Sequence, residues 1–258
     1  MLLADLLSRR AIAMNLQEHF LNSGAWLFRW RSYLPVLLLS IALLGLQGFH
    51  YPAGSHALDV LWEIFCFLVG LWGLAIRILT VGYTPAGTSA RSTRKPIAAE
   101  LNTTGMYSIV RHPLYLGNYF LWLAVALLPL AWWVPVITTL AFWLYYERII
   151  FAEEAFLQQK FGDDFLRWAA RTPTFLPSLR LWKPPRLCFS LYTVLKREIS
   201  GLFALVVAIN VFEVAEDLVV EGKLEIDVFW AAVLGCTTLL YGLSVVAKKK
   251  RLLEVEGR

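Results

Sequence analysis

LYLGNYFLWLAVALLPLAWWVPVITTLAFWLYYERII, residues 114–150, sets the architecture expected for this protein. No charged side chain occurs in it before Glu147. A membrane-spanning helix needs about 20 mostly apolar residues, so the stretch has room for two. The two apolar runs, Leu114–Leu130 and Trp132–Ile150, are joined only through the region Pro129–Trp133. The stretch therefore predicts a tight helical hairpin in a membrane, its second helix continuing towards Phe161.

Four further apolar runs flank this hairpin. They are Tyr33–Phe49 and Ala57–Leu79 before it, and Ile199–Val219 and Ile226–Ala247 after it. The composition agrees, with 58% hydrophobic and 17% charged residues among 258 and a mean hydropathy of +0.58. A soluble domain carries roughly 25% charged residues. The sequence thus predicts an all-α, polytopic membrane protein with about six transmembrane helices.

Lysine and arginine residues mark one side of the predicted membrane. They occur in the N-terminal segment, after the second run, after the fourth run and in the C-terminal tail, while the connections His50–His56 and Pro129–Trp133 lack them and Glu221–Asp227 has only Lys223. Cytoplasmic loops carry such an excess. Both termini and both long loops are therefore expected in the cytoplasm. The net charge of +5 is dispersed, so no nucleic acid is expected as a partner.

The chain divides into four predicted segments. Residues 1–32 are an N-terminal segment, interpreted either as an amphipathic helix at the membrane surface or as a loosely ordered tail. Residues 33–100 hold the first two helices and a basic loop, 101–185 a core with the hairpin, and 186–258 an accessory helical pair with a basic tail. The three cysteines are scattered without a CxxC pair, which indicates neither a zinc site nor a disulfide framework.

The stretch GMYSIVRHPLYLG, residues 105–117, carries the first candidate site. Arg111 and His112 directly precede Pro113, and proline is well tolerated in the first turn of a helix. Pro113 is therefore expected to begin the third span. Arg111 and His112 would then lie at its cytoplasmic mouth, beside backbone N–H groups and the positive end of the helix dipole. An anionic group would be favoured there.

A second stretch, residues 145–177, carries carboxylates and a further arginine motif. Glu153 and Glu154 stand at the cytoplasmic end of the fourth apolar run, and Phe161-Gly162 and Arg171-Thr172-Pro173 follow. Carboxylates at that depth are costly unless they are paired or functional. An α-ammonium group would be a suitable partner for them.

These motifs, in this order and spacing, resemble the isoprenylcysteine carboxyl methyltransferase family, of which phospholipid methyltransferases are a related branch. The resemblance covers about Leu101–Pro177 and, weakly, the two preceding helices. It implies an enzyme that holds S-adenosylmethionine in a cytoplasm-facing pocket and methylates a lipid or lipid-like substrate in the membrane. It also implies site residues. His112, Tyr115, Leu116 and Gly117 would line the cofactor, Glu153 or Glu154 would receive its amino group, and Arg111 and Arg171 would orient the acceptor.

One departure bears on the acceptor. Many relatives have an acidic residue four positions before the arginine of the Arg-x-Pro element, where this chain has Arg167. The loop Thr88–Lys95 adds hydroxyls and cations on the same side. Such groups suit phosphate and carboxylate. The hypothesis is O-methylation of an anionic group, a carboxylate or a lipid phosphate such as that of lipid A; N-methylation of a phospholipid amine is the alternative.

Two other classes of protein remain as alternatives. A membrane reductase using NADPH would share a related helical hairpin, but the Asn-Tyr element typical of it is missing here. A transporter would need charged residues in the middle of its spans. Arg77 is interpreted as snorkelling from a helix end, and Glu213, Glu216 and Asp217 as a helix end at the membrane surface. The oligomeric state is not predicted.

Overall fold

The computed structural model describes residues 2–31, 33–85, 87–88, 98–224 and 227–255, and in these residues it contains helices and no strand. The predicted all-α class is thus confirmed. Part of the predicted basic loop, with Arg91, Arg94 and Lys95, lies outside the described residues.

The hairpin is formed by α5 (Pro113–Leu127) and α6 (Trp133–Phe161), which pack against each other. Pro113 begins α5 as expected, because its fixed φ suits a first helical turn and its missing N–H has no partner there anyway. α6 ends at Phe161, where Gly162 takes a positive φ of 53°. The sequence therefore predicted both helices and the far end of α6.

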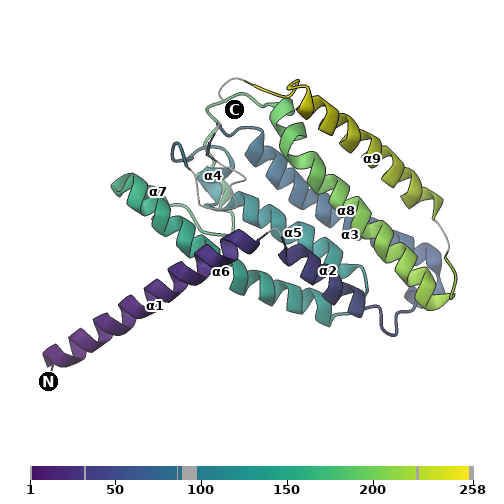
Figure 1. The fold of residues 1–258 in the computed structure, drawn as a ribbon, viewed down its shortest axis with the longest axis horizontal. Coiled ribbons are helices and arrows are strands. Elements are labelled where there is room, and N and C mark those ends of the chain that lie inside the picture. The colour runs from purple at the N-terminus through teal and green to yellow at the C-terminus, as the bar shows by residue number, and fades with distance from the viewer. Residues whose placement is uncertain (1, 32, 86, 89–97, 225–226, 256–258) are drawn as a thin grey trace.

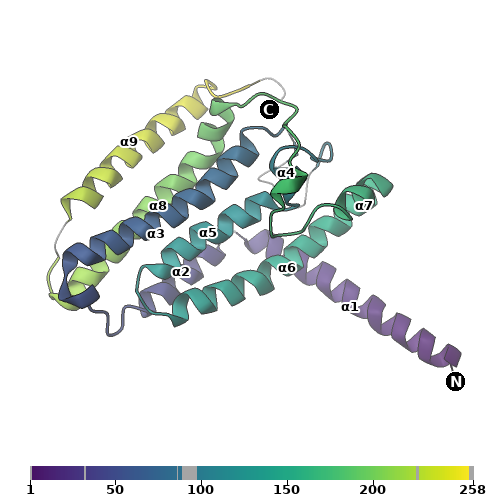
Figure 2. The ribbon, with the colours of Figure 1, turned by 180° about the vertical axis from the view of Figure 1, so that it is seen from behind.

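The helices pack in succession (Figures 1 and 2). α9 (Val228–Lys249) lies on α8 (Leu191–Val220), α8 on α3 (His56–Val81), α3 on α5, and α5 on α6. The largest buried apolar cluster joins these elements and includes Cys66, Ala124, Phe212 and Trp230. The C-terminal pair is thus packed onto the predicted core through α8.

The N-terminal segment is helical. α1 (Leu2–Trp30) packs its second half on α6, where the Tyr145 hydroxyl donates to the Leu27 carbonyl at 2.6 Å, while its first half projects from the bundle (Figure 1). Residues 2–30 are thus helical rather than loosely ordered, and the expected place of this helix at the membrane surface stays a prediction. α2 (Leu34–Leu44) is shorter than the expected span Tyr33–Phe49. The chain turns after Leu44, with Gly48 at a φ of 77°.

Four short helices complete the described chain: η1 (Pro52–Gly54), α4 (Met106–Ile109), α7 (Asp163–Ala169) and η2 (Leu179–Leu181). α4, α7 and η2 lie at the end of the bundle where α3 ends and α5 begins (Figure 1). Backbone bonds hold this end together. The Arg111 amide donates to the Pro173 carbonyl at 2.9 Å, and the Ser178 amide donates to the Ile109 carbonyl at 3.0 Å.

Among the described residues, three helices, α3, α6 and α9, are long and apolar enough to cross a membrane. Large apolar side chains on them remain exposed, among them Trp72 on α3, Trp143 on α6 and Leu239 on α9. Extended apolar surface of this kind is rare on soluble monomers. The protein is therefore an integral membrane protein. The prediction of six spans is not confirmed. α2 has 11 residues and α5 has 15, fewer than a span needs, and α8 is not among the candidate spans.

α3 and α5 cross at two glycines. A Cβ atom at Gly73 would lie 2.5 Å from the Gly117 carbonyl oxygen and 2.8 Å from Phe120 Cβ. Gly73→Ala is therefore expected to lower the free energy of unfolding by about 1–3 kcal/mol through overpacking. Thermal unfolding in detergent would measure it. The matched control is Gly235→Ala in α9, where a Cβ meets nothing within 4 Å; equal effects of the two changes would contradict the prediction.

Candidate active site

A cavity of about 490 Å³ opens at the end of the bundle where α3 ends and α5 begins. It lies among the end of α1, α3, the segment around α4, the start of α5, the polar end of α6 and the first turns of α8. The volume is in the range typical of small-molecule sites. Its lining mixes apolar and aromatic groups with charged ones, the latter being Arg31, Arg77, Glu100, Arg111, His112, Glu153, Arg197 and Glu198.

Arg111 and His112 both line this cavity and both bind Glu154. Arg111 Nη1 donates to Glu154 Oε2 at 2.8 Å, and His112 Nε2 lies 2.8 Å from Glu154 Oε1. Arg111 Nη2 also donates to the Thr174 hydroxyl. Glu154 itself is not among the lining residues. It therefore ties the start of α5 to α6, while Arg111 additionally holds the segment after Arg171.

Of the two motif glutamates, Glu153 is the one that lines the cavity. The Tyr115 hydroxyl donates to Glu153 Oε1 at 2.6 Å, and His112 Nδ1 lies 3.7 Å from Glu153 Oε2. The rings of His112 and Tyr115 are stacked, with centroids 5.6 Å apart. Because α6 positions Glu153 and the start of α5 positions the two rings, the structure brings His112, Tyr115 and Glu153 together at the cavity. Of the two glutamates that the sequence left as alternatives, Glu153 lines the cavity and Glu154 does not.

Leu116 and Gly117 do not line the cavity. Leu116 is 5% exposed and packs with Ile109 and Val110. A Cβ at Gly117 would lie 2.7 Å from the Gly73 carbonyl oxygen, so this glycine permits the close crossing of α3 and α5. A role for these two residues in holding the cofactor would have to act through the position of α5.

Arg167 and Arg171 also lie away from the cavity lining. Arg167 is exposed and pairs at 2.5 Å with Asp164 on the same short helix, and Arg171 is exposed at the end of α7. A pair this exposed contributes little to stability. The structure therefore does not bring these two arginines together with Arg111 around the cavity.

The structure adds a buried polar network that the motifs did not indicate. Arg77 Nε donates to Glu198 Oε2 at 2.6 Å, and Arg77 Nη2 donates to Glu198 Oε1 at 3.0 Å. Arg77 also donates to Asn118 Oδ1, and Asn118 Nδ2 donates to the Tyr146 hydroxyl at 3.0 Å. All four residues line the cavity. The signal in the sequence was Arg77, a charged residue within the apolar run Ala57–Leu79. The structure shows it paired with Glu198 rather than snorkelling.

Further charged and aromatic groups surround the cavity. Arg31 stacks on the ring of Phe28 at 4.0 Å, and both line it, as does Arg197. Tyr107 lies in α4, and its carbonyl accepts from Trp168 Nε1 at 3.1 Å. Burial, and then the Glu153 carboxylate, raise the pKa of the Tyr107 phenol above its ordinary value. Tyr107 is therefore a neutral hydroxyl donor at physiological pH.

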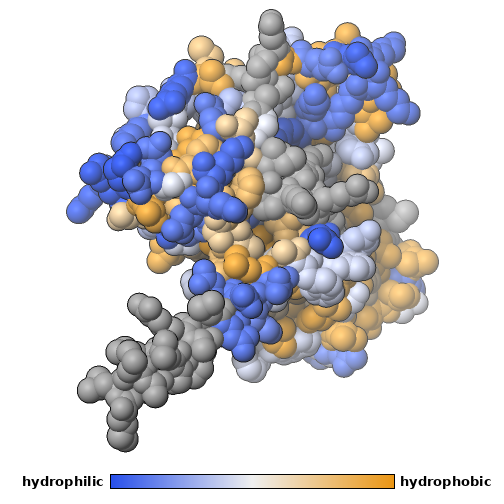
Figure 3. All heavy atoms as spheres, turned by 60° about the vertical axis from the view of Figure 1, so that its left-hand side comes forward, coloured by the Kyte–Doolittle hydropathy of each residue, from blue (hydrophilic) through white to orange (hydrophobic). Residues whose placement is uncertain are grey.

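The surface at this end is mixed in character. Figure 3 turns it forward and shows hydrophilic side chains gathered in the upper part, with hydrophobic ones between and below them. A charged cavity bordered by apolar surface suits a ligand with a polar group and an apolar body.

Comparison with known proteins places part of the chain in a family. Residues 63–164 match the model of the phospholipid methyltransferase family. The chain is 31% identical over 154 residues to the nickel-cobalt-cadmium resistance protein NccN of Alcaligenes xylosoxydans xylosoxydans, covering 60% of this chain and 65% of NccN. It is 39% identical over 83 residues to the cobalt-zinc-cadmium resistance protein CzcN of Cupriavidus metallidurans, covering 32% of this chain and 38% of CzcN.

An enzyme is also among the relatives. Protein-S-isoprenylcysteine O-methyltransferase of Schizosaccharomyces pombe is 33% identical over 78 residues, 30% of this chain and 33% of the enzyme. The chain thus spans less than two thirds of the length of each of these curated relatives. No solved structure matches it. The matched segment contains α5, both motif glutamates, and Arg111 to Gly117. Residues 63–164 therefore belong to the phospholipid methyltransferase and isoprenylcysteine O-methyltransferase-like family of membrane proteins.

Proposed function

We propose that this protein transfers a methyl group from S-adenosylmethionine to an anionic group of an amphiphile in the membrane. The observation that carries the proposal is the convergence of Arg111, His112, Tyr115 and Glu153 on a cavity of about 490 Å³ at the end of apolar helices. Family membership of residues 63–164 supports methyl transfer as the reaction.

The lining of the cavity fits this cofactor. Glu153 offers a carboxylate for an α-ammonium group, and the rings of Tyr107, Tyr115, Tyr146 and Trp168 offer apolar faces. S-adenosylmethionine supplies an electrophilic methyl group on a sulfonium centre when it is bound. The chain's own contribution is to align the acceptor and exclude water, since this displacement depends on orientation and a desolvated nucleophile. No strong base is required.

The anionic acceptor is supported by the cations around the cavity. Arg31, Arg77, Arg111 and Arg197 line it, although all four also have partners within the protein. Arginine binds phosphate and carboxylate with bidentate geometry. We therefore assign acceptor orientation to Arg111 together with Arg31 or Arg197, in preference to the exposed Arg167 and Arg171.

A labelled methyl-transfer assay tests the function. The purified protein is supplied with radiolabelled S-adenosylmethionine and vesicles holding, separately, a lipid phosphate, a lipid-linked carboxylate or phosphatidylethanolamine. Label is expected on an anionic lipid. Label confined to phosphatidylethanolamine would show that the acceptor is an amine and not an anionic group. S-adenosylhomocysteine should raise the unfolding temperature and NADPH should not; the reverse result would favour a reductase.

The cavity is proposed to face the cytoplasm. Cys188 is exposed and lies at the same end of the bundle, where the Ser190 amide donates to the Gly82 carbonyl at 2.9 Å. A membrane-impermeant thiol reagent is expected to label it in inverted vesicles and not in intact cells. Cys188→Ser should remove the signal, because Cys66 is buried and Cys236 lies in the apolar helix α9. Labelling in intact cells would show that the cavity faces the opposite side of the membrane.

A second candidate function concerns the physiological setting. Two relatives are named for metal resistance, one to nickel, cobalt and cadmium and the other to cobalt, zinc and cadmium. Methyl transfer by this chain would then serve metal tolerance. Cells that carry an inactive Glu153→Gln variant are expected to grow less well in cobalt than cells with the unchanged protein. Equal growth of the two strains would show that the enzymatic activity does not contribute to metal tolerance.

A further inference from the structure

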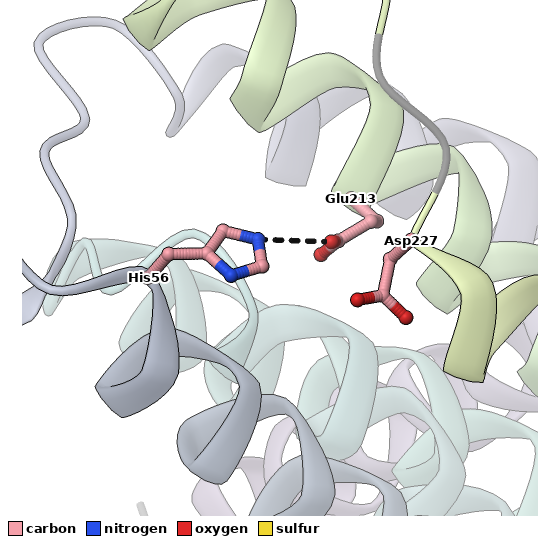
Figure 4. Close-up of side chains that lie close together, drawn as sticks. All are labelled: His56, Glu213 and Asp227. Carbon is pink, nitrogen blue, oxygen red and sulfur yellow. Dashed lines mark ion pairs between the residues drawn. The ribbon is translucent and has the colours of Figure 1, made fainter.

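A second cluster of ionisable side chains lies at the opposite end of the bundle from the cavity. It is formed by the start of α3, the end of α8 and the start of α9, whereas the cavity contacts the end of α3 and the start of α8. Figure 4 shows His56, Glu213 and Asp227 from these three helices pointing toward one another. Asp59, Glu63, Glu216 and Asp217 lie on the same helices near this end.

Glu213, Glu216 and Asp217 are buried in the protein rather than turned to a membrane surface, contrary to the interpretation from the sequence. Asp59 and Glu216 are each 1% exposed and Glu213 is 3% exposed. The side chains turn inward because α8 is covered by α3 on one flank and by α9 on another. Burial of several carboxylates in one place is unfavourable unless something neutralises them.

Hydrogen bonds within the described residues satisfy only part of this charge. The Tyr51 hydroxyl donates to Asp217 Oδ1 at 2.6 Å, and Trp230 Nε1 donates to Glu63 Oε2 at 2.5 Å. Within the part of the chain that the structure describes, both oxygens of Asp59, both of Glu216 and Oε1 of Glu213 are buried and have no hydrogen-bond partner. Among the described residues, one ion pair involves these carboxylates. His56 Nε2 lies 3.4 Å from Glu213 Oε1.

The spacing of donor atoms suits a metal ion. One donor atom each from His56, Glu213 and Asp227 lie within 4.8 Å of one another, and the same holds for Asp59, Glu213 and Glu216. Ligands of a tetrahedral zinc ion, at about 2.0–2.2 Å from the metal, lie roughly 3.5 Å apart, close to the His56–Glu213 distance. Small side-chain movements would close the first set around one ion.

His56, Glu213 and Asp227 are each positioned for this role. The ring of Tyr51 packs edge-on against the His56 imidazole, with centroids 5.4 Å apart. Asp227 accepts from the Trp230 amide through Oδ1 at 2.9 Å, which leaves its other oxygen for a ligand. The side chain of His56 is 44% exposed, so an ion can enter from that side.

We propose that His56, Glu213 and Asp227 bind a divalent transition-metal cation of the zinc, cobalt or nickel type. An imidazole with two carboxylates is a ligand set for such borderline ions, whereas magnesium prefers oxygen ligands and water. Asp59 and Glu216 adjoin this set, because Glu213 is shared between the two groups of donor atoms. The proposal does not rest on methyl transfer, because the two sites lie at opposite ends of the bundle.

Binding by the full-length, untagged and metal-stripped protein in detergent tests the site. Titration calorimetry with Zn²⁺ is expected to show about one equivalent bound, and Co²⁺ should give ligand-field absorption that Zn²⁺ removes. Millimolar Mg²⁺ should not displace Zn²⁺. Failure of Zn²⁺ and Co²⁺ to bind, or displacement by Mg²⁺, would overturn the proposal and leave protons as the species that neutralise these carboxylates.

Variants locate the ion. His56→Ala, Glu213→Gln and Asp227→Asn are each expected to weaken Zn²⁺ binding at least tenfold and to remove the rise in unfolding temperature that Zn²⁺ causes. His50→Ala, an exposed histidine in the same connection, should bind as the unchanged protein does. Binding that survives His56→Ala and Asp227→Asn unchanged would overturn the assignment. These two variants keep the test decisive even if the buried Glu213→Gln variant fails to fold.

Discussion

Glu153→Gln is expected to reduce S-adenosylmethionine binding about 30- to 1000-fold. The carboxylate lines the cavity, its side chain is 21% exposed, and glutamine keeps its shape and can still accept from the Tyr115 hydroxyl. What is lost is the negative charge opposite the ammonium group of the ligand. Removing one partner of a largely desolvated charge pair costs about 2–4 kcal/mol, which corresponds to that range.

Measurements of ligand binding and turnover distinguish the loss of this charge from a general loss of structure in the Glu153→Gln variant. The dissociation constant of S-adenosylhomocysteine, measured by calorimetry, should rise as strongly as the apparent KM for S-adenosylmethionine, while the unfolding temperature without ligand stays near that of the unchanged protein. Glu147→Gln, an exposed glutamate on the same helix, is the matched control and should bind normally. Normal binding by Glu153→Gln would remove this residue from the cofactor site and leave Glu154 as the alternative.

Glu198→Ala is expected to lower the free energy of unfolding by about 3 kcal/mol. Glu198 is 3% exposed and accepts from Arg77 through both its oxygens, so its removal leaves a guanidinium group in a mostly desolvated place. Breaking a buried ion pair from one side costs about 3–5 kcal/mol. Thermal and denaturant unfolding in detergent measure the change.

The double variant Arg77→Met with Glu198→Leu distinguishes stability from function. Replacing both partners by apolar groups of similar size is often neutral or stabilising, so the double variant should recover most of the lost stability. Methyl transfer by the double variant should nevertheless be lower than that of the unchanged protein, because Arg77 lines the cavity and holds Asn118. Activity that returns together with stability would show that the pair serves packing alone.

The sequence predicted the elements whose signals are local. Uncharged runs indicated α5 and α6, Pro113 marked the start of α5, and rising polarity indicated that α6 continues to Phe161. The motif residues Arg111, His112, Tyr115 and Glu153 also lie together as expected. Local signals suffice here because the two helices are neighbours in the chain and a short turn fixes how they pair.

Residues far apart in sequence could not be paired in this way. Arg77 and Glu198 lie 121 positions apart, and no pattern in either helix indicates that α8 packs on α3. The rotation of α6 about its own axis decides that Glu153 faces the cavity while Glu154 binds Arg111 and His112, and periodicity cannot separate two adjacent residues on a helix end.

The same reason applies at the other end of the bundle. The sequence of α8 places Glu213 and Glu216 near a helix terminus, a pattern that suits a membrane surface. Packing between α3 and α9 instead buries Glu213 beside His56 and Asp227 (Figure 4) and Glu216 beside Asp59. Composition and local motifs specify helices and the residue types they carry. Which side chains share a site depends on the crossing of helices distant in the chain, set by contacts such as Gly73 on Gly117 that no single segment encodes.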